Sequence, residues 1–215
     1  MAPDVAPVES AIAAAATAHP GVVGEAVGRQ HRPGRVAAEA GQPAAAQGGA
    51  GARVAPLQAA LLDDPVAFLS AEHARQTVLL GHLERVACAP LGRAARGLAA
   101  MLLGWLTAEL PIHIEDEERS LYPRLAAHDA SGVLPTLQAR HREDRNAVGA
   151  VLAGLRCVAA GEEPDGDFTA AALAFVSGHR RHLALEEEAV TPLAHRVLAP
   201  EALSALADEM ARRRS

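Results

Sequence analysis

The chain has 215 residues, of which 50% are hydrophobic, and carries a net charge of -6 at pH 7. This length suffices for one domain with a full core, and the apolar content excludes a chain that is disordered throughout. All 20 basic residues are arginine, and the acidic balance indicates neither a nucleic-acid surface nor a membrane-binding stretch. Aromatic residues make up only 2% while alanine and leucine dominate, which favours helices over sheets and predicts an all-α fold.

We expect a cytoplasmic protein, because the sequence shows no targeting signal and no pattern of paired cysteines. We expect neither a signal peptide nor a transmembrane helix, because the longest uninterrupted apolar run, Leu98 to Leu106, is too short to span a bilayer and the N-terminus lacks a basic segment. Cys88 and Cys157 lie far apart and form neither a CxxC pair nor a disulfide framework. They are interpreted as buried or inert thiols in a reducing compartment.

The composition divides the chain in two. Residues 1–56 are rich in Ala, Gly and Pro and have no sustained apolar stripe, which predicts a disordered tail. Residues 57–215 carry the periodic apolar pattern of helices. The sequence therefore predicts one folded domain over residues 57–215.

Four long helical segments are predicted in this second part. The first opens at Asp64-Pro65, an N-cap followed by a proline, and the second is expected to bend near Pro111 and Pro123. In chain order the segments cover about residues 65–88, 93–127, 134–160 and 167–198, and a short final helix begins at Pro200. Long helices joined by short loops are typical of an antiparallel up-and-down four-helix bundle.

Histidines recur on the apolar faces of these helices. With about 100° per residue, His73 lies among the leucines of the first helix whereas His82 points to the opposite side. His141 lies on the apolar face of the third helix in the same way. We expect His73 and His141 to enter the core.

The second and fourth helices each add a histidine and a glutamate one turn apart. His113 and Glu117 share the apolar face of the second helix, where Glu115 and Glu118 are expected to point away. The spacing His-x-x-x-Glu-Glu, with a proline ten residues after the histidine, recurs at His182 and Glu186. This internal repeat predicts two similar helical hairpins packed about a pseudo-dyad.

These six side chains have the chemistry of a two-metal site. Two glutamates in an apolar core need cations or protons to neutralise them. Mixed nitrogen and oxygen donors favour iron, with manganese as the alternative. Two bridging carboxylates and an oxo or hydroxo bridge would leave one or two positions free for dioxygen, peroxide or nitric oxide. The predicted ligands are His73, His113, Glu117, His141, His182 and Glu186.

Two neighbouring residues are left out of this set. His179 lies one turn before His182 and is interpreted as a supporting or surface residue. Asp144, three residues after His141, is interpreted as part of a solvated cluster of charged residues, with orientation of an imidazole or metal binding as the alternatives.

The ordered set of motifs resembles the hemerythrin-like, or HHE cation-binding, family over about residues 60–198. The resemblance implies a four-helix bundle with a carboxylate-bridged di-iron centre that carries, senses or reacts with oxygen species, or handles iron. The oxygen carriers of the family have His-x-x-x-His in the third helix, whereas His141 is followed at that spacing by Arg145. Simple reversible oxygen carriage is therefore not expected.

Two classes of function stay open. The first is a di-iron protein that binds, senses or reduces a small oxidant, linked to oxidative or nitrosative stress, with four terminal histidines and two bridging glutamates. The second is a non-enzymatic iron sensor or store, or an iron-sulfur-centre repair protein, whose metal occupancy controls folding and partner binding; the bacterial repair proteins carry an N-terminal cysteine pair, and no cysteine precedes Cys88 here. Ferritin-like oxidases and zinc proteases are rejected, since neither Glu-x-x-His nor a His-Glu dipeptide occurs.

Overall fold

The structure is a computed structural model that describes residues 55–58 and 61–215, and every regular element in this part of the chain is a helix. The prediction of a disordered tail falls almost entirely on residues outside the described ones. Within the described part, the bounds of the predicted helices agree with the observed ones to within about one residue at each end.

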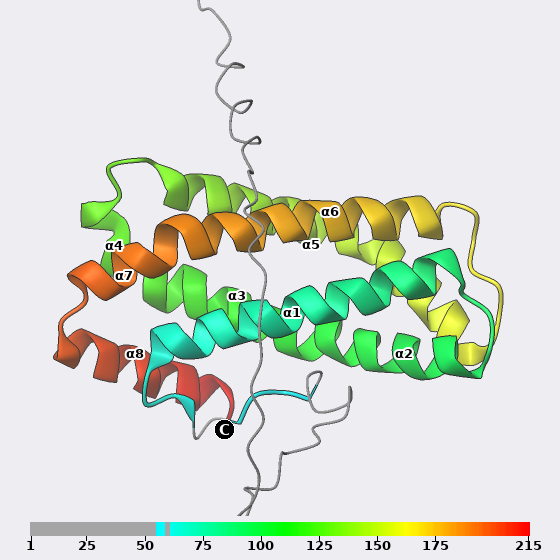
Figure 1. The fold of residues 1–215 in the computed structure, drawn as a ribbon, viewed down its shortest axis with the longest axis horizontal. Helices are drawn as coiled ribbons and strands as arrows, with labels where there is room; N and C mark the ends of the chain where they lie inside the picture. The colour runs from blue at the N-terminus through cyan, green and yellow to red at the C-terminus, as the bar shows by residue number, and fades with distance from the viewer. Residues whose placement is uncertain (1–54, 59–60) are drawn as a thin grey trace, which may run out of the picture. The chain divides into compact units, whose positions relative to one another are not determined.

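Four long helical runs lie side by side and are joined at their ends (Figure 1). α1 packs against α2 and α6, and α5 packs against the same two helices, which closes a ring around one core. This is the predicted antiparallel four-helix bundle, and the short final helix α8 packs against α1. The runs are α1 (Pro65–Cys88); α2 (Arg93–Gly104), α3 (Leu110–Glu115) and α4 (Tyr122–Leu125) in one continuous run; α5 (Val133–Ala160); α6 (Phe168–Leu185) with α7 (Thr191–Val197); and α8 (Pro200–Arg213).

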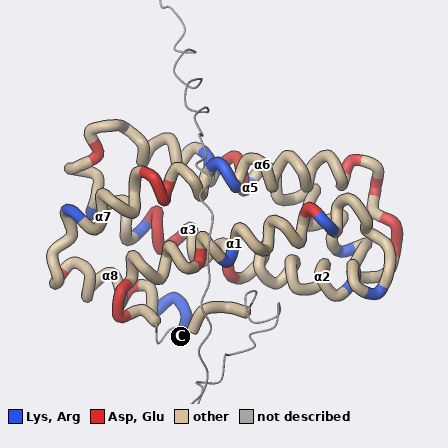
Figure 2. The backbone as a smooth tube through the Cα atoms, in the orientation of Figure 1, with Lys and Arg blue, Asp and Glu red and all other residues tan. Residues whose placement is uncertain are grey.

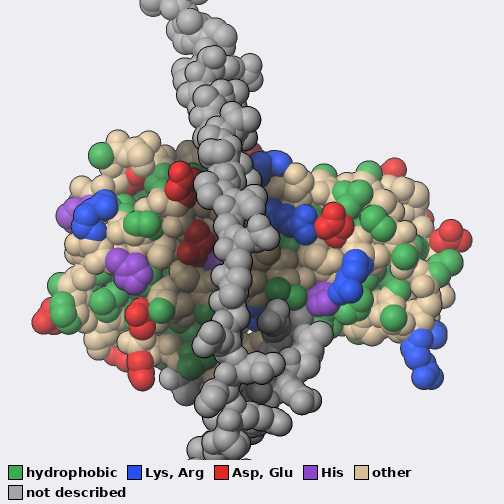
Figure 3. Space-filling model, viewed as in Figure 1, with side chains coloured by type: hydrophobic (Ala, Val, Ile, Leu, Met, Phe, Trp, Pro, Cys, Tyr) green, Lys and Arg blue, Asp and Glu red, His purple; other side chains and the backbone are tan. Residues whose placement is uncertain are grey.

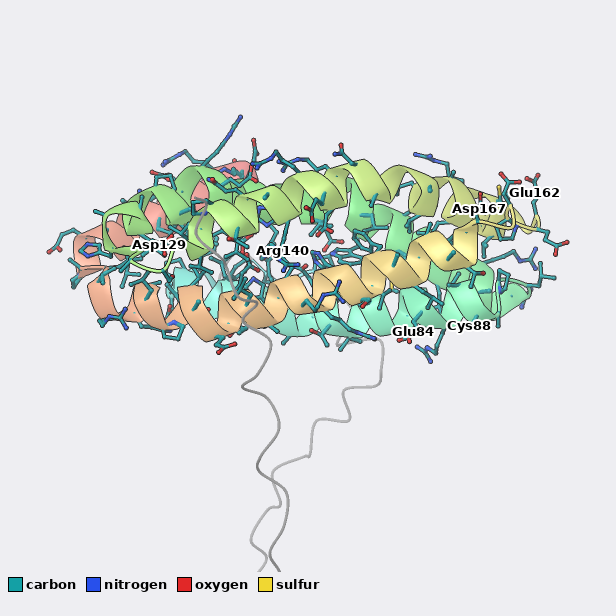
Figure 4. The ribbon with its side chains drawn as sticks, turned by 90° about the horizontal axis from the view of Figure 1, so that it is seen from above. Glu84, Cys88, Asp129, Arg140, Glu162 and Asp167 are labelled. Carbon is teal, nitrogen blue, oxygen red and sulfur yellow. The ribbon has the colours of Figure 1, made fainter. Side chains whose placement is uncertain are left out.

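Local sequence signals set the helix ends. Asp64 accepts a hydrogen bond from the backbone N–H of Ala67 at 3.0 Å and is followed by a proline in the first turn of α1, so the predicted cap is confirmed. Asp129 caps α5 from the preceding loop at one end of the bundle (Figure 4), where its carboxylate accepts the N–H of Leu134 at 2.9 Å. α5 ends at Ala160, and its C-cap is Gly161, whose φ of 86° favours glycine.

Apolar side chains fill the bundle in two clusters. One lies toward the α5–α6 loop and includes Leu79, Leu102 and Leu155; the other lies toward α8 and includes Phe68 and Leu125. Buried histidines and glutamates belong to neither cluster. The polar residues of the interior are thus flanked by apolar packing on both sides, which keeps bulk water away from them.

Three turns of the helices are π-helical. One residue and then a proline follow each of them. The N–H of Tyr122 bonds the carbonyl of Glu117, and the N–H of Thr191 bonds the carbonyl of Glu186, five residues back in each case. A third such turn, Trp105–Glu109, precedes Leu110-Pro111. Proline lacks an N–H and its ring crowds the carbonyl four residues earlier, and the wider turn relieves that crowding.

The cysteines and the longest apolar helix differ in part from what the sequence predicts. Cys88 and Cys157 are free, as expected; Cys88 is exposed and Cys157 half-buried, so of the two interpretations, buried or inert, burial does not hold for Cys88. By length and composition, one described helix, Arg93–His128, could cross a membrane, a property that core helices of soluble bundles share. The absence of a transmembrane helix stays a prediction.

Close packing between α5 and α6 predicts the effect of a single methyl group. A Cβ added to the buried Gly154 would overlap the ring of Phe168, whereas a Cβ at the exposed Gly149 meets nothing within 4 Å. We expect Gly154→Ala to lower the free energy of unfolding by about 1–3 kcal/mol, and Gly149→Ala to raise it by about 0.5–1 kcal/mol through helix propensity. Urea unfolding followed by circular dichroism measures both, and equal effects would contradict the packing described.

α8 docks partly through an ion pair that predicts a pH dependence. Glu209 accepts hydrogen bonds from Arg124 at 2.8 and 3.1 Å, and Arg124, followed by Ser120, lowers the pKa of Glu209 to about 2. A lowered pKa stabilises the fold above the ordinary value of 4.5 and loses that stabilisation as the pH falls toward 2. Because the pair is partly exposed, we expect Glu209→Gln to cost about 1 kcal/mol of unfolding free energy at pH 6 and progressively less below pH 4.5. Asp208→Asn, at the exposed neighbouring position, is the control.

Candidate metal centre

The six predicted ligand residues come together in the middle of the bundle. None has more than 4% of its surface exposed. Their ligand atoms form two groups, and within each group these atoms lie within 4.8 Å of one another. One group is His73, His113, Glu117 and Glu186, and the other is Glu117, His141, His182 and Glu186. The sequence predicted this convergence, and metal binding by these residues stays a prediction.

In the first group two imidazoles face both glutamates. Nε2 of His73 lies 3.3 Å from Oε1 of Glu117 and 3.4 Å from Oε2 of Glu186. Nε2 of His113 lies 3.3 Å from the same Oε1 of Glu117. α1 and the continuous second run thus place their histidine rings 4.9 Å apart between centroids, edge to face.

In the second group two imidazole nitrogens approach each other directly. Nε2 of His141 lies 3.0 Å from Nε2 of His182, and Nε2 of His182 lies 3.0 Å from Oε1 of Glu186. Nε2 of His141 is also 3.3 Å from Oε2 of Glu117. Two nitrogens bound to one cation at right angles, each at about 2.1 Å, lie about 3 Å apart, so this spacing fits two ligands of one ion.

Buried atoms without hydrogen bonds support the same fit. Among the described residues, Nε2 of His113, Oε2 of Glu117 and Oε2 of Glu186 are buried and have no hydrogen-bond partner. Buried polar atoms are nearly always satisfied, and each exception needs an explanation. Cations shared by Glu117 and Glu186 would satisfy all three atoms. The donor set therefore fits a pair of metal ions.

The pKa values of the histidines and of Glu117 in the first group indicate which groups carry the balancing positive charge without a cation. Burial lowers the pKa of His73, but hydrogen bonds with Glu117 and Glu187 outweigh it and raise that pKa to about 9. Burial also lowers the pKa of His113, but Glu117 outweighs it and raises that pKa well above its ordinary value. Burial raises the pKa of Glu117, yet the imidazoles hold it well below its usual range. Protons on imidazoles thus neutralise the glutamates when metal does not.

Three carboxylates hold the outer nitrogens of three of the histidines. Nδ1 of His73 lies 2.6 Å from Oε1 of Glu187, and Nδ1 of His113 lies 2.9 Å from Oε2 of Glu72. Nδ1 of His141 lies 3.0 Å from Oε1 of Glu118. Carboxylates in this position orient a metal-binding imidazole and direct Nε2 toward the metal.

The prediction that Glu118 points away from the site is wrong. A helical wheel treats one helix alone, and Glu118 lies on the flank of its helix that faces the neighbouring α5, where it reaches His141. Its neighbour Glu115 does point away and pairs with the exposed Arg119. One sequence signal could have found these carboxylates, since Glu72, Glu118 and Glu187 each stand directly beside a predicted ligand in the chain.

The fourth histidine breaks this pattern. Within the described part of the chain, Nδ1 of His182 is buried without a hydrogen-bond partner. In the repeat, Arg140 precedes His141 as Glu72 precedes His73, and Arg140 lies between α5 and α6 (Figure 4). An arginine cannot accept the Nδ1 proton of an imidazole. The two halves of the centre therefore differ in the groups that support them.

His179 and Asp144 belong to a buried polar cluster beside the centre. His179 is 1% exposed, and its ring nitrogens lie 2.8 Å from Oδ2 of Asp144 and 2.8 Å from Oε1 of Gln76. The ring stacks on that of His182 with centroids 5.5 Å apart. The interpretation of Asp144 as a solvated surface residue is wrong, because the packing of α5 against α6 leaves its side chain only 14% exposed, with Oδ2 beside Nδ1 of His179. His179 supports the site and is in neither ligand group.

Other histidines stay outside the centre. His128 and His195 are exposed, and His82 pairs with Arg85 on the outer side of α1. The remaining two, His19 and His31, lie outside the described residues. A tyrosine also contacts the centre, since the hydroxyl of Tyr122 donates a hydrogen bond of 2.5 Å to Oε1 of Glu186.

These observations define a class of protein, an all-α four-helix bundle with a buried histidine and glutamate centre that fits metal cations. Among models of protein families, that of the hemerythrin HHE cation binding domain matches residues 64–194. The chain therefore belongs to this family, as its motifs predicted. A comparison with curated proteins gave no match. Membership and the buried donor groups together support the binding of a metal cation.

The contact between Glu118 and His141 can be tested against its neighbour. We expect Glu118→Gln to weaken metal binding by about 10- to 100-fold, because the imidazole loses the carboxylate that orients it. Glu115→Gln removes the same charge from the outer face of the same helix and should leave affinity unchanged. Competition with a chromogenic chelator measures both. Identical affinities for the two variants would show that Glu118 does not support the centre.

Proposed function

We propose that this protein is a di-iron protein whose centre binds, senses or reduces a small oxidant such as dioxygen, peroxide or nitric oxide. The observation that carries the proposal is the pair of donor groups that share Glu117 and Glu186. Two cations held by common carboxylates act on one ligand together. A structural site for a single ion would need neither the sharing nor the second pair of histidines.

The donor types support iron. Each group offers two imidazoles and two shared carboxylates, and no thiolate. Imidazole with carboxylate suits iron, and manganese is the alternative. Four protein donors are fewer than the six of an octahedral ion, so positions stay free for an added ligand. When bound, iron supplies the electrons and the open coordination position for a small oxidant.

The chain itself supplies access and water exclusion. A surface hollow of about 440 Å³ between α1 and α6 reaches His73, with Ser70, Thr77 and Glu187 on its walls. A molecule of a few atoms can approach through it, while the two apolar clusters exclude bulk water toward the two ends of the bundle. Burial and the nearby glutamates raise the pKa of Tyr122 above its ordinary value, so its hydroxyl keeps its proton and goes on donating to Glu186.

The proposal includes a cytoplasmic protein without nucleic-acid or membrane partners. On the visible face of the molecule, outside the area that grey atoms cover, basic and acidic side chains are interspersed among apolar ones (Figure 3). Such a mixture supports the absence of a nucleic-acid partner, because nucleic acid requires a continuous basic surface.

The first test measures metal content and visible absorption of protein produced in iron-replete cells. We expect about two irons per chain, with absorption typical of a bridged pair, followed by spectral changes on adding peroxide, nitric oxide or oxygen in turn. The double variant His182→Ala, Glu186→Ala should lose most of the iron and the absorption, because it removes donors from both groups.

Its control changes the same residue types on the outer side of the same helical run. His195→Ala with Glu188→Ala alters exposed residues and should keep two irons. Iron binding that stabilises the fold, with no response to any of the three oxidants, would favour the iron sensor or store. A wild-type chain that holds no iron after anaerobic reconstitution contradicts the di-iron proposal.

A further inference from the structure

The end of α8 carries two arginines that reach the interior of the bundle. Figure 2 shows this basic end beside the C-terminus of the chain. Arg213 donates to Oδ1 of Asp116 at 2.7 Å, and Arg214 donates to Oδ2 of the same carboxylate at 2.6 Å. Asp116 has no exposed surface and directly precedes Glu117. Two guanidinium groups at the end of α8 thus bind a buried carboxylate next to a predicted ligand.

Arg214 also contacts the carboxylate that supports His113. Its Nη2 lies 3.3 Å from Oε2 of Glu72, and that same oxygen lies 2.9 Å from Nδ1 of His113. A continuous series of polar contacts therefore links α8, α1 and the second helical run. Burial raises the pKa of Glu72, but His113 and Arg214 outweigh it and lower that pKa below its ordinary value.

Further contacts fix the position of these arginines. Arg213 donates to the hydroxyl of Ser120 at 2.6 Å, and the guanidinium of Arg214 lies 4.9 Å from the ring centroid of Phe68. Leu206 and Met210 of α8 are fully buried in the apolar cluster that contains Phe68 and Leu125. The arginines can keep these contacts only while α8 is docked.

We propose that Arg213 and Arg214 are positioning residues of the metal centre, so that docking of α8 and occupancy of the group containing His113 stabilise each other. The proposal rests on metal binding by this centre, as inferred above. The arginines keep Glu72 and Asp116 in place, and Glu72 directs Nε2 of His113 toward the cation. Coupling of this kind is reciprocal, so metal must hold α8 as firmly as α8 holds the metal.

The repeat makes the coupling one-sided. His182, the counterpart of His113, has no hydrogen-bond partner on Nδ1 among the described residues, and Arg140 occupies the position of Glu72. Through Glu72, the contacts at the end of α8 reach His113, which is a member of only the first donor group. Of the two ions, the one in this group should respond to changes in α8.

The test follows the release of Fe(II) from the loaded protein to a ferrous chelator under anaerobic conditions. Arg214→Gln should speed release of one of the two irons by about 10-fold. Arg212→Gln removes the same charge from an exposed position two residues earlier and should leave both rates unchanged. Because Arg214 acts through Glu72, the effect of Arg214→Gln should be smaller in a Glu72→Gln background than in the wild type.

A second measurement tests the reciprocal effect and does not depend on a fully stable variant. Limited proteolysis of the wild-type chain should cut α8 more slowly when Fe(II) is bound, and Arg214→Gln should reduce this protection. Equal release rates for Arg214→Gln and Arg212→Gln, or protection that Arg214→Gln leaves unchanged, overturn the coupling while metal binding stands. A wild-type chain that binds no Fe(II) overturns both.

Discussion

The fold depends on the neutralisation of two glutamate carboxylates buried in the centre of an apolar bundle. Glu117 and Glu186 are each 1% exposed, and an ionised carboxylate in such a place is strongly unfavourable without a cation or protonated partner. All four helical runs of the bundle contribute to this neutralisation. Their imidazoles face the two carboxylates, and further carboxylates contact the outer nitrogens of three of these imidazoles. The apolar clusters on either side make this neutralisation necessary, because they exclude the water that would otherwise solvate the charges.

Local backbone structure and site are linked through the prolines. The backbone carbonyls of Glu117 and Glu186 each accept a hydrogen bond from the N–H five residues later. A proline directly follows the donor residue in each case. π-helical turns of this kind occur often at functional sites. Here the same feature occurs in both halves, so the repeated Glu-Glu and proline pattern that is visible in the sequence corresponds to a repeated backbone geometry.

Periodicity predicted the helices and the six inward residues because both depend on a single helix and its apolar face. It failed where the answer depends on two helices at once. Glu118 reaches a histidine of α5, and Asp144 reaches His179 of α6; neither contact can be derived from one helical wheel. The arginines of α8 are a similar case, because the loop that returns this helix to the bundle determines which carboxylates they meet.

The sharing of Glu117 and Glu186 has a consequence for how the two halves of the chain depend on each other. Each half brings two histidines and one glutamate, yet each donor group needs glutamates from both halves. A hairpin made alone would hold an incomplete set for either ion. Metal in this centre would therefore act as a cross-link between the two similar hairpins, and one hairpin alone could complete the set only by pairing with a second chain.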